Sequence, residues 1–276
     1  MKPYLPIGLL LSLLFVLCSN SSHAVDEAKS PLFGKRPNIV LIMTDDQGWL
    51  HLGSSGHPFL HTPRSDEFAK ESLVFNDFVV SSTCAPTRAA LMSGAHPFKS
   101  GVTHTIHERE RMALDMTTLP EVLQSAGYRT GIFGKWHLGD EVVRQHGFEE
   151  WVSVMDRLWA EYTKPESLAL DTTYHDFLRS KGLEPDEDRP GGKMFSDDFR
   201  ARLPEELQIA SYLAGEAVDF VAANKESPFV LYVGFLEPHP PFYGPLDDLY
   251  DPETLPVDPV FLKKPLGHSI FSRTRA

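Results

Sequence analysis

Three short apolar runs, each followed directly by polar residues, constrain the fold of this chain more than any other feature. The runs cover residues 37–44, 128–133 and 229–235. An apolar run that does not alternate with polar residues is typical of a strand buried on both faces, as in a parallel sheet covered by helices. Residues 73–80 are a candidate for a further strand. We therefore predict an α/β fold with a mostly parallel central sheet and helices on both of its faces.

Helix signals lie between these runs. Residues 118–121 combine a Thr cap, an early Pro and a Glu in the first turn, and they predict a helix that Gly127 ends. A longer helix is predicted to start at residues 203–206, whereas the charged residues 151–194, which contain Pro and Gly clusters, are expected to form an irregular insertion. The apolar face of the longer helix is expected to contain Leu207, Ala210, Ala214, Ala217, Val218 and Val221.

Polar side chains stand at the carboxyl end of each predicted strand. Asp45 and Asp46 follow the first run. Lys135 and His137 follow the second run at strand spacing, so both side chains can face one side. His239 follows the third run. Because the carboxyl ends of parallel strands meet at one edge of a sheet, where open α/β sheets bind their ligands, we expect these side chains to lie close together.

The adjacent carboxylates of Asp45 and Asp46 need an explanation, because they repel each other and are costly to bury. On its own, such a pair indicates a solvated turn, or a helix cap at Asp46. After a buried strand, a bound divalent cation explains the pair better. Carboxylate oxygens suit a hard ion such as Ca²⁺ or Mg²⁺ rather than Zn²⁺.

Cys84 is expected to lie at the N-terminus of a helix. Pro86 has the fixed φ that suits a first helical turn, residues 89–92 are good helix formers, and Gly94 is a natural end. Arg88 lies one turn beyond Cys84 and can reach back toward it. The free N–H groups and the dipole of a helix N-terminus favour negative charge there. The alternative is a buried, inert cysteine that packs as a small hydrophobic residue.

The N-terminal residues predict export. A basic residue, an apolar run over residues 7–18 and a small-residue cleavage site are typical of a signal peptide, here residues 1–24, and a linker over residues 25–36 follows. The run is too short for stable membrane insertion, so we expect a periplasmic or secreted protein. Removal of the signal would leave Cys84 as the one cysteine, which excludes an internal disulfide. The formal net charge of −12 argues against nucleic acid as a partner, since phosphate contacts need a basic surface.

The stretch from Cys84 to Arg88 resembles the signature of the sulfatase family, Cys-x-Pro-(Ser or Thr)-Arg. Here the signature reads Cys-Ala-Pro-Thr-Arg. Residues 134–139, Gly-Lys-Trp-His-Leu-Gly, look like a second segment of the family, Gly-Lys-x-His-x-Gly. The resemblance implies that residues 37–276 are an incomplete, N-terminal portion of a sulfatase catalytic domain with an alkaline-phosphatase-like fold.

The resemblance also implies a nucleophile and a cofactor. In the family the signature cysteine is oxidised to formylglycine, here at Cys84, and a formylglycine-generating enzyme would therefore be a partner of this chain. Asp45, Asp46 and the modified Cys84 would be metal ligands. The resemblance makes Ca²⁺ the expected ion, ahead of Mg²⁺.

Further residues take catalytic roles from the resemblance. Arg88 would hold the formylglycine in place. Lys135 would contact both the sulfate and the formylglycine hydroxyl, and His137 would hold that hydroxyl and act as the base of the second step. His239 would contact the sulfate or the departing oxygen. The implied reaction is hydrolysis of a sulfate ester, either a small aryl sulfate or a sulfated saccharide.

The family pattern continues beyond the last matching stretch of this chain. It has a further strand ending in Asp-Asn or Asp-His, which completes the Ca²⁺ site, and a later Lys that helps to protonate the leaving group. Neither is found before Ala276, so we expect a C-terminally truncated domain with low stability and little activity. Two alternatives stay open: a phosphonate or phosphate ester hydrolase that uses the same nucleophile, and an inactive remnant.

Overall fold

The structure of the chain is a computed structural model that describes residues 32, 34–105, 109–154, 170–185, 197–240, 242 and 244–256. The predicted signal peptide and most of the predicted linker lie outside these residues, so the predicted domain boundaries stay predictions. The chain divides into two units, and every helix and strand below belongs to the second one, Asn38–Ala276.

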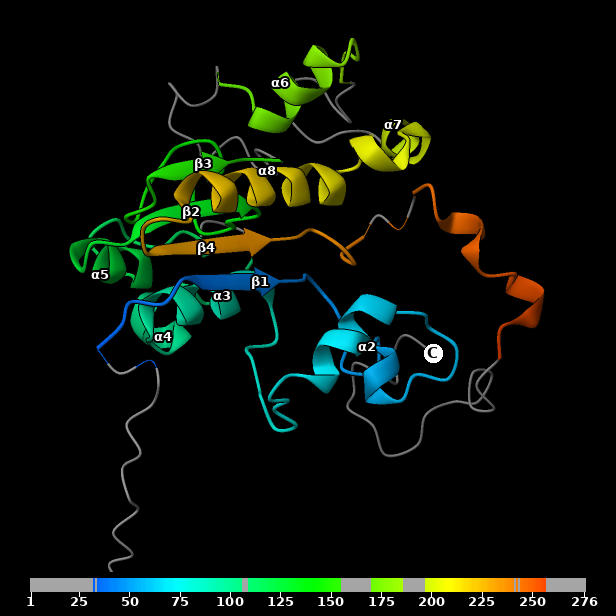
Figure 1. Cartoon of the computed structure of the whole chain (residues 1–276), viewed down its shortest axis with the longest axis horizontal. Helices are drawn as coiled ribbons and strands as arrows, with labels where there is room; N and C mark the ends of the chain where they lie inside the picture. The colour runs from blue at the N-terminus through cyan, green and yellow to red at the C-terminus, as the bar shows by residue number, and fades with distance from the viewer. Residues whose placement is uncertain are drawn as a thin grey trace, which may run out of the picture. The chain divides into compact units, whose positions relative to one another are not determined.

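A parallel sheet lies at the centre of this unit, as the apolar runs predict (Figure 1). Its strands, in chain order, are β1 (Ile39–Met43), β2 (Arg129–Gly134), β3 (Glu150–Val152) and β4 (Phe229–Gly234). In space the order is β1-β4-β2-β3, and every neighbouring pair is parallel. The last residues of β1 and β2 both pair with the last residue of β4, so these strands end level with one another.

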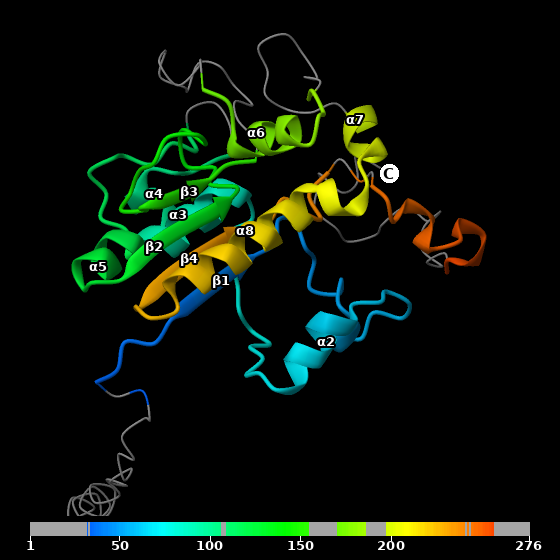
Figure 2. The same cartoon turned by 45° about the horizontal axis from the view of Figure 1, so that its top comes forward.

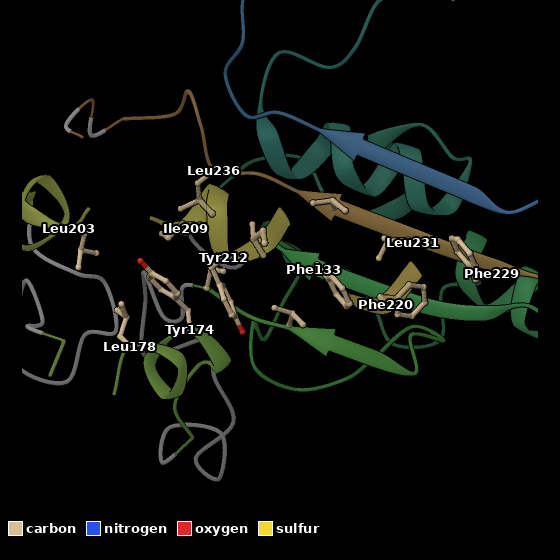
Figure 3. Close-up of a cluster of buried hydrophobic side chains, with 14 residues drawn as sticks. Phe133, Tyr174, Leu178, Leu203, Ile209, Tyr212, Phe220, Phe229, Leu231 and Leu236 are labelled. Carbon is tan, nitrogen blue, oxygen red and sulfur yellow. The ribbon is translucent and has the colours of Figure 1, made fainter. Parts of the chain in front are cut away.

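One face of the sheet is covered by α8 (Ile209–Asn224), which runs along β4 and β2 (Figure 2). Phe220 of this helix meets Phe133 of β2 and Phe229 of β4 edge to face, with ring centroids 5.5 Å apart in each pair. These rings belong to a larger cluster of buried apolar side chains (Figure 3). The burial of this cluster is what holds α8 on the sheet, since removing apolar area from water is the main stabilising contribution.

The other face is covered by α3 (Cys84–Ser93), which starts at the predicted residue. The helix ends at Gly94, whose φ of +64° gives the left-handed cap that the sequence predicts. Ala85 and Ala89 have no exposed surface and belong to the same buried cluster as Ile132 of β2. Their small side chains let the first turns of α3 lie close to the sheet, so the N-terminus of the helix reaches its carboxyl edge.

Shorter elements complete the described part of the unit. The helix predicted from the Thr118 cap is present, and Thr118 and Glu121 form a capping box at its start. The 3₁₀ turns are η1 (Gly53–Ser55), η4 (Glu205–Leu207), η5 (Asp247–Leu249) and η6 (Pro252–Thr254). The remaining helices are α2 (Pro63–Lys70), α4 (Pro97–Ser100), α5 (Leu119–Ser125), α6 (Thr173–Ser180) and α7 (Asp197–Arg202).

The prediction of a strand over residues 73–80 is wrong. In the structure this segment is irregular and joins α2 to α3. Its apolar side chains are exposed, and Val79 keeps 88% of its surface. Among the described residues no strand pairs with it, and an apolar run without a hydrogen-bonding neighbour is not held in strand geometry.

The predicted irregular insertion over residues 151–194 is wrong in part, because it contains most of β3 and all of α6. The predicted face of the long helix also needs correction. α8 buries Ile209, Tyr212, Leu213 and Phe220, whereas Val218 is 66% exposed. The helix has apolar residues on two faces, and the face with the larger side chains removes more area from water.

The C-terminal part of the predicted face lines an open groove instead, whereas Leu207 lies in η4, before the helix starts. Ala214, Ala217 and Val218 form one wall of an apolar cavity of about 480 Å³, and Val40 and Ile42 of β1 form part of the other. Among the described strands, β1 has β4 as its one neighbour, and Ile42 is 67% exposed. Within the described ranges, no helix has both the length and the apolar character that a membrane span requires.

These two environments of isoleucine predict different costs of truncation. Ile132 has no exposed surface, so Ile132→Ala is expected to lower the free energy of unfolding by about 2–5 kcal/mol. Ile42→Ala is expected to change it by no more than roughly 0.5 kcal/mol, because Ile42 is exposed. Urea unfolding followed by circular dichroism measures both values. If Ile42→Ala lowered the free energy of unfolding as much as Ile132→Ala does, the Ile42 side chain could not be exposed as described.

Candidate active site

The segment after β1 brings two carboxylates to the carboxyl edge of the sheet. The backbone N–H of Asp45 donates to the carbonyl of Glu237, 3.2 Å away, which ties the end of β1 to the segment after β4. The Asp45 carboxylate is buried, whereas the Asp46 side chain is half exposed. Asp46 has a φ of +60°, a left-handed conformation that Asp tolerates better than most residues. The two adjacent carboxylates therefore point into different surroundings.

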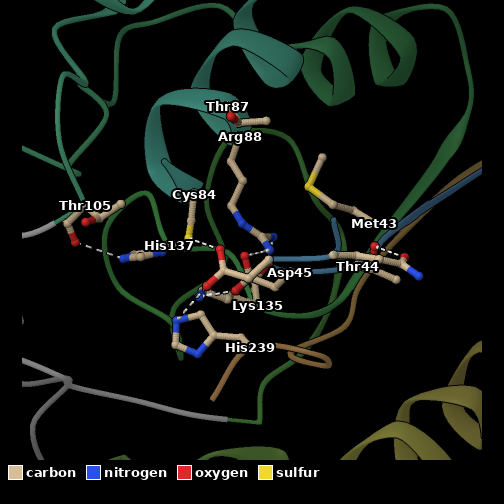
Figure 4. Close-up of polar contacts among 12 residues, drawn as sticks. Met43, Thr44, Asp45, Cys84, Thr87, Arg88, Thr105, Lys135, His137 and His239 are labelled. Atoms are coloured by element: carbon tan, nitrogen blue, oxygen red, sulfur yellow. Dashed lines mark hydrogen bonds and ion pairs between the residues drawn. The ribbon is translucent and has the colours of Figure 1, made fainter. Parts of the chain in front are cut away.

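Asp45 is the anion of a buried charge cluster (Figure 4). Lys135 Nζ donates to its Oδ2, and Arg88 Nη2 lies 3.7 Å from its Oδ1. All three side chains are at most 5% exposed. Burial alone would raise the pKa of Asp45, but Lys135 first and Arg88 second outweigh it and hold that pKa below its ordinary value. Asp45 is therefore ionised and paired.

Arg88 connects α3 to two strand ends. Its Nη1 donates to the carbonyl of Lys135 at 2.7 Å and to the hydroxyl of Tyr232 at 2.6 Å. The sequence predicts that Arg88 reaches back toward Cys84, but within the described ranges its hydrogen bonds and its ion pair are formed with Lys135, Tyr232 and Asp45. Tyr232 was not anticipated. Its position on a buried strand was the available signal, since a buried phenol needs a polar partner.

Cys84 is the first residue of α3, as predicted, and lines a cavity of about 510 Å³ together with Asp45, Asp46 and Arg88. Its Sγ lies 3.8 Å from Asp46 Oδ1. Burial raises the pKa of the thiol to about 11; the two carboxylates add to this effect and Lys135 opposes it. A helix N-terminus alone would favour the thiolate, so the nearby carboxylates and the burial dominate here.

Lys135 and His137 lie in a turn, not on a strand, so the predicted strand spacing is wrong. β2 ends at Gly134, where a Cβ atom would lie 2.1 Å from the carbonyl oxygen of Gly234. His137 has a φ of +60°. The turn sends Lys135 to Asp45, while His137 Nε2 donates to the carbonyl of Thr105 at 3.0 Å.

His137 carries a neutral imidazole. Burial first, and the charges of Lys135 and Arg88 second, lower its pKa to about 3. Because a carbonyl only accepts, Nε2 must carry the proton that Thr105 receives. Nδ1 is buried and has no hydrogen-bond partner among the described residues. It is therefore the ring nitrogen left to accept a proton.

Glu141 supports this turn and was not anticipated from the sequence. Its carboxylate accepts the backbone N–H groups of Trp136 at 2.9 Å and of His137 at 2.6 Å. Burial raises its pKa to about 7, although both N–H groups act in the opposite direction. One acidic residue in a polar stretch carries little information, so no local pattern singles it out.

His239 lies beside the Asp46 carboxylate. Its Nε2 is 3.8 Å from Asp46 Oδ2, and its Nδ1 donates to the carbonyl of Pro240 at 2.6 Å. Within the described ranges, Asp45, Cys84 and His239 each offer one ligand atom, and these atoms lie within 4.8 Å of one another. Asp46 contacts both Cys84 and His239. The predicted ligands Asp45, Asp46 and Cys84 are therefore close together.

This donor set fits a hard divalent cation. Two carboxylates converge on residue 84, and carboxylate oxygens are what such ions prefer. A thiol at residue 84 is a soft donor, whereas an oxygen in the same place would match the two carboxylates. Lys135 and Arg88 already neutralise part of the charge on Asp45, which lowers the affinity that Asp45 can contribute.

The sequence of this chain is similar to that of a known protein family. The Sulfatase family profile matches residues 37–254. Arylsulfatase G of Canis lupus familiaris is 33% identical over 226 residues, which is 75% of this chain and 41% of that protein. N-acetylgalactosamine-6-sulfatase of Mus musculus is 31% identical over 224 residues, with 75% and 41% covered. Arylsulfatase A of Bos taurus is 50% identical over 107 residues, which is 37% of this chain and 21% of that protein.

Solved structures agree with the fold. The protein BT4656, in complex with its substrate D-glucosamine-2-N,6-O-disulfate, matches 74% of this chain and 35% of its own, with a TM-score of 0.50 and 26% identity. A phosphonate monoester hydrolase from Silicibacter pomeroyi matches 80% of this chain and 45% of its own, with a TM-score of 0.59 and 18% identity, which shows the fold alone.

The chain spans about two fifths of the length of arylsulfatase G and of N-acetylgalactosamine-6-sulfatase. The matched residues include the whole of the charge cluster, Cys84 with its helix, the turn after β2, and His239. A family match over residues 37–254, which is most of the chain, makes this chain a member of the sulfatase family.

Proposed function

We propose that this chain carries the nucleophile and the sulfate-binding cations of a sulfuric ester hydrolase. One observation carries the proposal. Asp45, Lys135 and Arg88 form a buried charge cluster beside Cys84, where the strands end and α3 begins (Figure 4). A sulfate ester has spread negative charge, and preorganised cations at a buried site stabilise it as the transition state forms.

The proposed nucleophile is a formylglycine made from Cys84, which is supported by the Cys-x-Pro-Thr-Arg signature. One hydroxyl of the hydrated aldehyde attacks sulfur, and the alcohol leaves. The second hydroxyl then loses its proton, sulfate is expelled, and the aldehyde returns. A plain serine would have no second hydroxyl and so no such exit from the covalent intermediate.

His137 is the proposed base of the second step. The hydrogen bond from Nε2 to Thr105 fixes the ring, and Nδ1, which has no partner among the described residues, is the nitrogen that would accept the proton. Lys135 is the proposed contact for sulfate, and His239 the proposed contact for sulfate or the departing oxygen. Arg88 would orient residue 84 indirectly, through Asp45 and the Lys135 backbone.

Asp45, Asp46 and residue 84 would hold a divalent cation, for which Ca²⁺ is our first choice. When bound, the ion would supply positive charge beside the substrate's sulfate group. The family resemblance supports this choice, as do the two carboxylates that converge on residue 84. A formylglycine-generating enzyme and an export route are part of the same proposal.

We propose sulfated saccharides or aryl sulfates as the substrate class. The relatives are named as arylsulfatases and as an N-acetylgalactosamine-6-sulfatase, and BT4656 was solved with a disulfated glucosamine. The phosphonate monoester hydrolases among the neighbours, at 20% and 18% identity, share the fold and add no argument for a phosphonate substrate.

The modification can be tested directly. Coexpression of the chain with a formylglycine-generating enzyme is expected to lower the mass of the peptide that contains Cys84 by about 18 Da, from conversion of thiol to aldehyde. Ala85→Ser, which keeps the signature, should be converted like the natural sequence, whereas Pro86→Ala should retain the thiol. A thiol that stays intact in the natural sequence would count against the proposed nucleophile and favour an inactive remnant.

Turnover separates the two ester classes. The modified chain is expected to hydrolyse 4-nitrophenyl sulfate faster than 4-nitrophenyl phosphate, although slowly compared with the roughly 10 s⁻¹ of a typical enzyme. Lys135→Ala should lower the sulfate rate by about 10²–10³-fold, because it removes a cation from the site. The exposed Lys225 offers a matched control, since Lys225→Ala should leave the rate unchanged. Faster hydrolysis of the phosphate would favour the alternative activity.

Metal affinity is a further test. Asp45, Asp46 and residue 84 supply fewer than the usual 6–8 oxygen ligands of Ca²⁺, so we expect a dissociation constant weaker than about 10⁻⁴ M. Calorimetric titration of the chain with CaCl₂ measures it, and Asp46→Asn should weaken it further. A submicromolar constant would show that further ligands complete the site.

A further inference from the structure

The turn after β2 has a conformation that its own sequence does not favour. His137 has a φ of +60°, which is uncommon for a residue with a Cβ atom and costs of the order of 1 kcal/mol or more. The turn nevertheless has to place Lys135 against Asp45 and His137 against Thr105. A contact elsewhere must therefore hold it in place.

Glu141 provides that contact. Its two carboxylate oxygens accept the N–H groups of two consecutive residues, Trp136 and His137, at 2.9 and 2.6 Å. Both groups belong to the turn itself. Within the described ranges no Lys or Arg forms an ion pair with Glu141, which is 9% exposed, so these N–H groups are its direct partners.

Both sides of this contact are anchored. The ring of Trp136 is fully buried and packs edge to face on Trp151, with centroids 5.8 Å apart. Trp151 belongs to β3, and its Nε1 donates to the backbone carbonyl of Glu141 at 2.6 Å. The sheet thus fixes Glu141 through Trp151, and Glu141 fixes the turn. The carbonyl of Lys135 in turn accepts from Arg88 at 2.7 Å, so the position of the turn also affects Arg88.

We propose that Glu141 is a positioning residue: by accepting the N–H groups of Trp136 and His137, it holds the left-handed turn that aims Lys135 and His137 at the site around Cys84. This inference rests on the proposed function only for the catalytic role of the site around Cys84. The contacts of Glu141 are independent of that function, and the test below requires no turnover.

The test compares two identical substitutions in the full chain. Glu141→Gln replaces one acceptor oxygen by an NH₂ group, which cannot accept an N–H. Amide hydrogen exchange of residues 135–138 is expected to become about tenfold faster, with β4 amides within about twofold of the natural chain. Glu149→Gln is the matched control, since Glu149 accepts from Thr130 N at 3.2 Å, outside the turn. It should leave exchange in the turn unchanged.

A spectroscopic readout separates positioning from general stability. In the natural chain the imidazole ¹⁵N signals of His137 are expected to show one neutral tautomer, with the proton on Nε2. Glu141→Gln should move them toward an average of both tautomers, because the turn no longer holds the ring against Thr105. A chain that had only lost stability would keep the single-tautomer signals in its folded fraction.

A second variant keeps the inference testable if Glu141→Gln does not fold. Trp151→Phe keeps an aromatic ring in the core and removes the indole N–H that fixes Glu141, so it should raise exchange in the turn by roughly two- to fivefold. Unchanged exchange in the turn in the variants that fold would overturn the proposal, as would an equal rise in β4. Absence of formylglycine or of turnover would count against the proposed function alone.

Discussion

The pairing of the Asp45 carboxylate with Lys135 and Arg88 is the interaction on which the rest of the site depends. Each of these charges would be costly to bury alone, and removing one partner of such a group typically costs about 3–5 kcal/mol. The three residues come from the end of β1, the turn after β2 and the first turns of α3. The cluster therefore joins segments that are far apart in the sequence, and residue 84 lies beside it.

Sheet register makes this pairing geometrically feasible. Met43, Gly234 and Gly134 lie side by side at the ends of their strands, so the residues that follow them start from the same level. Two glycines at this level allow a close approach, since a Cβ at Gly134 would meet the Gly234 carbonyl. Arg88 can then reach across the end of β4 to the Lys135 carbonyl. The charge cluster can therefore form because the strands end level with one another and approach closely at these glycines.

The charges around residue 84 disfavour the unmodified cysteine as a nucleophile. A thiol with a pKa of about 11 is almost entirely protonated at neutral pH and is a weak nucleophile. The carboxylates of Asp45 and Asp46, which disfavour a thiolate, are the groups that would hold a cation. The same electrostatic environment thus opposes thiolate chemistry, and this supports the proposal of a neutral, hydroxyl-bearing nucleophile at residue 84.

Local patterns in the sequence determined the strands that form the sheet core, the start of α3 at Cys84, the capped helix at Thr118 and the clustering of Asp45, Lys135 and His239. These features depend on short-range patterns of apolar, capping and turn residues, and on the rule that parallel strands end together. The tertiary structure alone decided the partners of Arg88, the turn at His137, the role of Glu141, the buried face of α8 and the loss of the strand over residues 73–80. The physical reason is that hydrogen bonds between distant segments, and competition between two apolar faces for the same core, leave no periodic signal in the sequence.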